Sequence, residues 1–202
     1  MAFRLYNTQS RQLEEVRPID GQTIRMYTCG PTVYDFVHIG NFRTFVFQDL
    51  LRRYITYKGF ALRHVMNTTD VDDKIIDKAG KAGVSIDQYT RQYTEAFFED
   101  VEKLHIQKPE VVPRATEHID GMVKLILQLR EQGHTYERDG STYYRISSFS
   151  EYGKLSRLDL SQVEPDSQID ADEYTKENPR DFVLWKARKE GEAYWDTPLG
   201  PG

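Results

Sequence analysis

The first third of the chain switches between a β-like and a helical pattern of apolar positions. Residues 24–29 are β-prone, and the Gly-Pro pair that follows them marks the end of a strand. From Gly40 to Lys58 apolar side chains recur at helical spacing until Gly59 stops the pattern; they are Phe42, Val46, Phe47, Leu50, Leu51, Tyr54 and Ile55. Residues 61–66 read as a second strand. This order predicts a βαβ unit, which crosses over right-handed in a parallel sheet, and hence an α/β fold.

Two further helices and a hairpin are predicted after this unit. Ser85 can cap a helix that runs to about Leu104, and residues 115–132 place apolar side chains on one face. Residues 135–146 change to an alternating pattern around Asp139-Gly140, which predicts a β-hairpin between aromatic strands.

The last quarter of the chain changes composition again. Residues 159–181 are acidic and polar and are typical of an exposed connection, and residues 182–185 form an apolar strand pattern. Since the helical period gives way to an alternating one, we expect a module boundary near residues 115–133.

Composition narrows the class of protein. The 202 residues are 39% apolar and 29% charged, which excludes a disordered chain and a collagen-like repeat. The net charge of −5 provides no overall basic field, so any nucleic-acid binding must be local. The single cysteine forbids an intrachain disulfide, and there is neither a signal-peptide pattern nor an apolar run long enough for a membrane helix. We therefore expect a cytoplasmic protein.

The loop of residues 29–41 follows the first predicted strand and precedes the first predicted helix. In open parallel sheets this position holds ligands, and the N–H groups at a helix N-terminus suit a phosphate chain. Gly30 and Gly40 allow backbone to approach a ligand closely, while His38 and Asn41 can donate hydrogen bonds to phosphoryl oxygens. The loop therefore predicts nucleotide binding.

Each of these residues also has an ordinary structural interpretation. A lone histidine near apolar residues is more often structural than a ligand, and a lone cysteine is usually a small core residue. Glycines beside a helix start are usually turn or cap residues. The combination, rather than any one residue, favours the nucleotide site.

Several short motifs carry a resemblance to a known family. His38-Ile-Gly-Asn41 resembles the His-Ile-Gly-His signature of class I aminoacyl-tRNA synthetases, with Asn in place of the final His. The motifs that narrow the resemblance to cysteinyl-tRNA synthetases span residues 26–35, 67–76, 113–118, 152–157 and 181–186. The resemblance covers the whole chain. It implies that residues 1–118 are the first half of a Rossmann-like, parallel-sheet nucleotide-binding catalytic domain, and that residues 119–202 begin an inserted α+β connective module.

The same resemblance implies a reaction and roles for the loop residues. Cysteine would be activated by ATP, accompanied by Mg²⁺, to cysteinyl-adenylate and then transferred to tRNA(Cys). His38 and Asn41 would stabilise charge on the phosphoryl oxygens, and Gly30, Thr32 and Gly40 would shape the ATP pocket. Because Asn41 cannot become cationic, we expect function to survive with a weaker charge contribution.

The resemblance further implies a zinc ion that selects the substrate. In the family, a cysteine at the position of Cys29 binds Zn²⁺, and the substrate thiolate completes the coordination. Zinc binds thiolates readily and a serine hydroxyl poorly, so one metal bond could separate cysteine from serine. Thr69 aligns with a family threonine that contacts the substrate, where its hydroxyl could bind the ammonium group; its alternative role is to cap the loop.

Three aspartates and one short lysine-containing segment have weaker functional interpretations. Asp70, Asp72 and Asp73 could suit Mg²⁺, but Asp72 and Asp73 fit better as caps of a helix that begins at Lys74, and we assign no metal to them. Residues 154–157 superficially resemble the lysine loop that supports ATP phosphates, but they match a different element of the family.

A basic helix face is also predicted, and we expect it to be solvated more readily than to bind RNA phosphates. Its members are Arg43, Arg52, Arg53 and Lys58.

Part of the family's machinery has no counterpart in this sequence. The remaining zinc ligands, the phosphate-supporting lysine loop, the second half of the sheet and the anticodon-binding region are expected beyond residue 202, so we interpret the chain as the amino-terminal portion of a longer enzyme that exposes apolar surface. Two alternatives stay open: a related ligase that joins cysteine to an amino sugar in thiol biosynthesis, and a noncatalytic short paralogue that acts as a binding module.

Overall fold

The computed structural model describes residues 3–156, 176, 178 and 180–202. These residues form two compact units. The first comprises the residues up to Leu5 together with Glu14–Ile119, and the second comprises Tyr6–Leu13 and the described residues from Asp120 onwards. The assignment of residues 1–118 and 119–202 to two functional modules remains a prediction.

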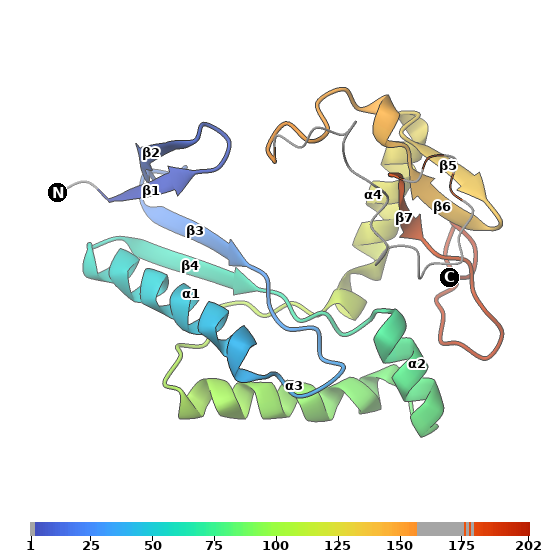
Figure 1. Ribbon diagram of the computed structural model, residues 1–202, viewed down its shortest axis with the longest axis horizontal. Helices are drawn as coiled ribbons and strands as arrows, with labels where there is room; N and C mark the ends of the chain where they lie inside the picture. The colour runs from blue at the N-terminus through green and yellow to red at the C-terminus, as the bar shows by residue number, and fades with distance from the viewer. Residues whose placement is uncertain (1–2, 157–175, 177, 179) are drawn as a thin grey trace. The chain divides into compact units, whose positions relative to one another are not determined.

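A parallel strand pair forms the centre of the first unit. Strands β3 (Thr23–Thr28) and β4 (Ala61–Met66) pair in parallel from Thr23 opposite Ala61 to Thr28 opposite Met66, and helix α1 (Ile39–Tyr57) connects them (Figure 1). This confirms the predicted βαβ unit and the α/β class. Residues 111–114 continue the sheet beyond β4 through parallel bridges of Val111 to Val65 and of Arg114 to Thr68. The sequence pattern did not predict this third extended segment, because it is too short to show a period.

Local capping signals set the helix ends of the first unit. Ser85 accepts a hydrogen bond from Gln88 N–H and caps α3 (Ile86–Lys103), as predicted. Asp72 caps α2 (Asp73–Ala82) by accepting from Ile75 N–H, so the predicted cap is confirmed and the helix begins one residue before the expected Lys74.

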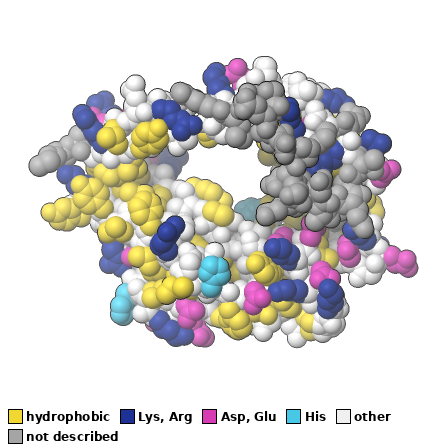
Figure 2. Space-filling model, in the orientation of Figure 1, with side chains coloured by type: hydrophobic (Ala, Val, Ile, Leu, Met, Phe, Trp, Pro, Cys, Tyr) yellow, Lys and Arg dark blue, Asp and Glu magenta, His cyan; other side chains and the backbone are white. Residues whose placement is uncertain are grey.

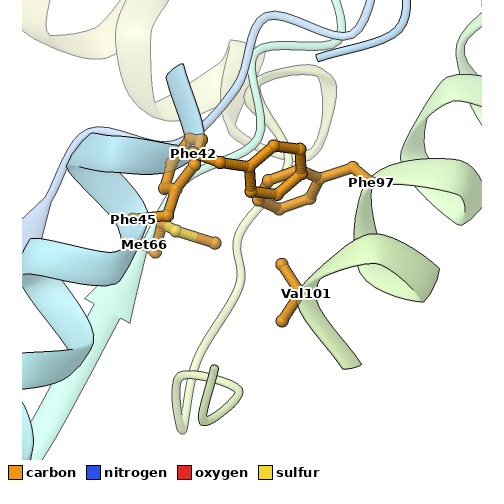
Figure 3. Packing of buried hydrophobic residues seen from close by; sticks show 5 residues of the cluster. All are labelled: Phe42, Phe45, Met66, Phe97 and Val101. Atoms are coloured by element: carbon orange, nitrogen blue, oxygen red, sulfur yellow. The ribbon is translucent and has the colours of Figure 1, made fainter. Parts of the chain in front are cut away.

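Aromatic side chains from α1 and α3 form the core beside the sheet. Phe42, Phe45 and Phe97 meet there, with Phe42 and Phe97 stacked at a centroid distance of 5.8 Å and Phe45 edge-on to Phe97 at 5.0 Å (Figure 3). Met66 of β4 and Val101 of α3 complete the cluster. Offset and edge-to-face aromatic pairs contribute stability beyond their buried area, so this cluster fixes α1, and with it the loop before α1, against the strands.

The predicted apolar face of α1 is only partly buried. Phe42 and Ile55 are buried as expected, but Phe47 and Leu50 are 63% and 62% exposed, and Phe45 is buried although the pattern did not single it out. The buried side chains of α1 pack in two clusters, one with Met66 and Phe97 and one with Phe3 and Ile24. Hydrophobic side chains are visible on the surface of the molecule (Figure 2), which agrees with the expectation of exposed apolar surface.

The second unit is built on a helix and a three-stranded antiparallel sheet. A 3₁₀ turn, η1 (Ala115–His118), leads into α4 (Ile119–Glu131). The sheet has the order β5 (Thr135–Arg138), β6 (Ser141–Tyr144) and β7 (Phe182–Trp185), with a short 3₁₀ turn, η2 (Ile146–Ser148), after β6.

The predicted hairpin and final strand of this unit are confirmed. Asp139 and Gly140 connect β5 to β6 with φ values of 51° and 76°, the left-handed geometry that tight hairpin turns require. Most of the predicted connection at 159–181 lies outside the described residues. Strands β1 (Arg4–Asn7) and β2 (Gln12–Glu15) form a separate two-stranded sheet that was not predicted. Within the described part of the chain, no helix has the length and apolar character needed to cross a membrane.

Candidate functional site

A pocket of about 340 Å³ lies in the loop between β3 and α1. Four of the predicted site residues line it: Gly30, Thr32, His38 and Asn41. The structure therefore brings the two predicted phosphate donors and two of the predicted pocket-shaping residues to one cavity. Three other predicted site residues do not line the pocket. Cys29 and Gly40 are neighbours in the sequence of the lining residues Gly30 and Asn41, and Thr69 pairs with Thr32 through a parallel bridge.

His38 caps α1 with one ring nitrogen, and this decides which nitrogen can donate a hydrogen bond to a ligand. Its Nδ1 atom accepts a hydrogen bond of 3.1 Å from Gly40 N–H. In the neutral ring the proton must then be on Nε2, which leaves an N–H donor on a side chain that lines the pocket. Glycine at position 40 leaves room for this cap, because a Cβ there would lie 2.9 Å from His38 Cε1 and the imidazole would have to shift.

The N-terminus of α1 favours a negatively charged guest. No acidic side chain occupies the first turn of this 19-residue helix, so the partial positive charge at its N-terminus is not compensated from within the helix. Asn41 lies in that turn, is exposed, and lines the pocket. The pocket thus combines two side-chain donors with a helix N-terminus, an arrangement that suits phosphoryl oxygens.

Two lysines contact residues that line the pocket, Tyr34 and Asp35. Lys78 forms an ion pair of 2.9 Å with Asp35 and places its Nζ 4.8 Å from the ring centroid of Tyr34, and Lys74 lies 5.1 Å from the same centroid. The hydrogen bond from Lys78 holds the pKa of Asp35 below its usual value, so this carboxylate stays ionised and Lys78 stays charged at neutral pH.

Gly30 makes a close approach that no larger residue could make. A Cβ at this position would lie 1.7 Å from the backbone oxygen of Asn67, and Gly30 N–H donates to Asn67 Oδ1 at 3.1 Å. Cys29, the preceding residue, is exposed with a free thiol. The strand end therefore presents Cys29 to solvent while Gly30 fits against the neighbouring strand end.

Thr69 lies directly across from the start of the pocket loop. It forms a parallel bridge with Thr32: Thr69 N–H donates to Pro31 O at 3.0 Å, and Val33 N–H donates to Thr69 O at 3.1 Å. The sheet thus extends past β3 and β4 and holds Thr32 beside Thr69. Sequence reasoning missed Asn67, whose side chain also contacts Thr69. The available signal was an amide residue directly after a strand end.

The described residues do not form a metal site by themselves. Within the described ranges, no group of three His, Cys, Asp or Glu side chains is arranged to hold a metal ion. Cys29 could supply one thiolate, whereas a catalytic zinc site has about three protein ligands. The residues present therefore do not fit a zinc ion without further ligands.

The aspartates after β4 have structural partners. Asp70 is 1% exposed and accepts hydrogen bonds from Arg114 Nε at 2.9 Å and from the Thr116 hydroxyl at 2.6 Å. Arg114 also pairs with Asp87, and its hydrogen bond lowers the pKa of that carboxyl. Asp70 thus joins the end of β4 to the segment that starts at Arg114.

The predicted solvated basic face of α1 is wrong for Arg52, whose side chain is only 12% exposed, whereas Arg53 is exposed as expected. Arg52 pairs with Glu110, and Arg53 pairs with Asp49 and donates to His105 O at 2.7 Å. Both arginines anchor the loop after α3 to α1, so they are held by protein partners. The periodicity could not show the contacts with Glu110 and His105, because these partners are more than 50 residues away in the sequence.

A buried histidine lies behind the strand end that carries the site. His64 is 3% exposed, and its Nε2 is 2.8 Å from the Thr28 hydroxyl. Burial, with a contribution from Arg52, lowers the pKa of His64 despite the opposing effect of Glu110. His64 is therefore neutral at physiological pH.

The segment 154–157, which superficially resembles the phosphate-supporting lysine loop, begins in the second unit. Lys154 forms an ion pair with Glu151 on an exposed turn, and Arg157 falls outside the described residues.

The chain is similar to curated proteins along its whole length. It is 56% identical to a cysteine-tRNA ligase of Solibacter usitatus and 50% identical to one of Koribacter versatilis, in each case over 100% of this chain. It covers 43% and 41% of those proteins, so it spans less than half the length of the curated relatives that it matches.

The fold has solved counterparts at low sequence identity. A Mycobacterium tuberculosis methionyl-tRNA synthetase in complex with methionyl-adenylate superimposes with a TM-score of 0.55 and 16% identity, over 64% of this chain and 33% of that one. The family model for the tRNA synthetases class I (C) catalytic domain matches residues 15–202. The chain therefore belongs to the class I (C) tRNA synthetase catalytic-domain family.

Proposed function

We propose that this chain is the amino-terminal part of a cysteine-tRNA ligase. In the first step, a carboxylate oxygen of cysteine attacks the α-phosphorus of ATP, forming cysteinyl-adenylate and releasing pyrophosphate. In the second, the terminal ribose hydroxyl of tRNA(Cys) attacks the acyl carbon, forming the ester and releasing AMP. The observation that carries the proposal is the 56% identity, over the full chain, to a protein named cysteine-tRNA ligase.

The pocket at the start of α1 supports the first step. His38 Nε2–H and the Asn41 amide are donors that could bind phosphoryl oxygens, and the N-terminus of α1 adds a fixed positive potential. Gly30 and Thr32 line the pocket, and Gly40 would shape it indirectly through its hydrogen bond to His38. This chemistry needs little more from the protein than positioning and stabilisation of developing charge.

Two parts of the proposal concern cysteine and its metal. Thr69 would accept a hydrogen bond from the substrate ammonium group. Cys29 would supply one thiolate to Zn²⁺, which would bind the substrate sulfur, but the described residues do not complete that site. Mg²⁺ would enter with ATP as part of the substrate. The zinc role and the cytoplasmic location remain predictions.

Cysteine-dependent exchange of pyrophosphate into ATP tests the proposal. We expect little exchange by residues 1–202 alone and robust exchange by a chain extended to the length of its relatives. The substitution Cys29→Ser in the extended chain should abolish exchange and lower the zinc content. An extended chain that activates serine as well as cysteine, or that shows no exchange, would contradict the proposal.

The variant His38→Asn separates catalysis from folding. Asn is a good N-cap and can accept from Gly40 N–H, but it cannot reach a phosphate as the imidazole can. We expect exchange to fall by roughly 10²–10³-fold, the usual cost of removing one donor to developing charge, with an unchanged melting temperature. Gly80→Ala is the control. Gly80 lies on an exposed turn of α2 and does not line the pocket, so this substitution should leave exchange unchanged.

A further inference from the structure

The side chain of Asn67 bridges the end of β3 to the substrate side of the loop after β4. Its Oδ1 accepts from Gly30 N–H at 3.1 Å and from the Tyr27 hydroxyl at 3.0 Å. Its Nδ2 donates to Thr69 Oγ1 at 3.1 Å. One amide therefore contacts the residue that follows Cys29 and the residue proposed to bind the cysteine ammonium group.

The orientation of this amide is fixed by a backbone group. Gly30 N–H can only donate, so it must face the amide oxygen of Asn67 and not the amide nitrogen. A flipped amide would place two donors against each other. Nδ2 is consequently forced toward Thr69, and Thr69 Oγ1 must act as the acceptor in this contact.

This arrangement restricts what the Thr69 hydroxyl can offer a ligand. One lone pair of Oγ1 is occupied by Asn67, and the hydroxyl proton cannot turn toward Nδ2 because that group is a donor. One acceptor direction therefore remains for an incoming N–H, and the hydroxyl proton is restricted to the two directions that point away from Nδ2. The backbone of Thr69 is fixed in the same region by its hydrogen bonds to Pro31 and Val33.

We propose that Asn67 is a positioning residue for the amino-acid substrate, which acts by orienting the Thr69 hydroxyl toward the substrate ammonium group. The proposal rests on the proposed function above, since it assumes that Thr69 contacts cysteine. The hydrogen bond from Gly30 N–H fixes the orientation of the amide, and Gly30 is the residue that follows Cys29. Asn67 thus contacts Thr69, expected at the amine of cysteine, and the neighbour of Cys29, expected at its thiol.

A purely structural role for Asn67 makes different kinetic predictions. Loosening of the loop would disturb the ATP pocket as well, because Gly30 and Thr32 line it. A role through Thr69 affects the binding of cysteine and leaves that of ATP nearly unchanged. It also disappears once the Thr69 hydroxyl is removed. These two properties decide between the roles.

The test is a double-mutant cycle in the extended chain, measured by pyrophosphate exchange. Asn67→Ala should raise the KM for cysteine roughly ten-fold, the loss of about one hydrogen bond, and change the KM for ATP less than two-fold. In a Thr69→Val background the same substitution should change the KM for cysteine less than two-fold. Asn67→Ser, which keeps a polar loop residue too short to bridge both partners, should reproduce the effect.

Each outcome of this experiment has a defined meaning. Asn7→Ala, a substitution of the same type in the β1–β2 hairpin, is the matched control and should alter neither KM. An equal rise in both KM values, a full effect in the Thr69→Val background, or loss of the fold in both Asn67 variants would overturn the positioning role. If the unsubstituted extended chain shows no cysteine-dependent exchange, the proposed function itself fails, and the positioning role fails with it.

Discussion

The substitution Gly30→Ala tests the packing that brings the two strand ends of the site together. Gly30 does not have a positive φ, so the backbone preference of alanine is not the obstacle. The obstacle is space, because the new Cβ would lie 1.7 Å from the backbone oxygen of Asn67, and real Cβ contacts essentially never fall below 3.0 Å. The two strand ends would have to separate by at least the difference between these distances.

That separation breaks the hydrogen bonds that hold the site. Gly30 N–H to Asn67 Oδ1, Thr69 N–H to Pro31 O, and Val33 N–H to Thr69 O span the gap at 3.0–3.1 Å. At a net value of about 0.5–1.5 kcal/mol for each of the three bonds, their loss lowers the free energy of unfolding by about 1.5–4.5 kcal/mol. The substitution should also abolish any nucleotide-dependent stabilisation, since Gly30 lines the pocket.

Urea unfolding followed by circular dichroism measures this effect, and a second glycine serves as the control. Gly80 lies inside α2, and a Cβ added there would meet no atom within 4 Å, so Gly80→Ala should raise the free energy of unfolding by about 0.5–1 kcal/mol. If Gly30→Ala stays within about 0.5 kcal/mol of the unsubstituted chain, the close approach is not a constraint and the reasoning is refuted.

Three further substitutions test the remaining interactions around the site. Asp72→Ala removes the cap of α2 and should cost about 1 kcal/mol in urea unfolding, whereas Asp72→Ser should restore most of it. Asp70→Asn removes a buried carboxylate that accepts from Arg114 and should cost about 1.5–3 kcal/mol; an unchanged melting curve would contradict its structural role. His64→Gln tests a pH effect: because the pKa of His64 is lowered in the fold by burial, the unfolded chain binds more protons as the pH falls below the ordinary value of 6.5. Stability should therefore fall with acidification through that window in the unsubstituted chain and fall less in the variant, as measured by melting temperature between about pH 7 and pH 5.

Local signals in the sequence were sufficient for most elements of the fold. The caps at Ser85 and Asp72 and the turn at Asp139-Gly140 were predictable because each is decided by residues within about four positions. The strand, helix and strand order around α1 likewise followed from periodicity and predicted a parallel pair. The pocket loop was predictable because its donors lie between a strand end and a helix start in the sequence itself.

The tertiary structure decided what depends on distant partners. Periodicity gave α1 an apolar face, but the position of α3 determined that Phe45 is buried and Phe47 is exposed. Arg52 and Arg53 were predicted as part of a basic face. In the structure Arg52 forms an ion pair with Glu110, and Arg53 donates to the backbone oxygen of His105, both in the segment after α3.

The same distinction applies to the site. The sequence by itself identified the candidate phosphate-binding residues and the family that the motifs resemble, because both are carried by contiguous residues. Only the tertiary structure showed that Asn67 bridges Gly30, 37 residues away, to Thr69. The physical reason is that such a bridge depends on the parallel register of two strand ends, and register is set by packing across the sheet and not by the residues next to it in the chain.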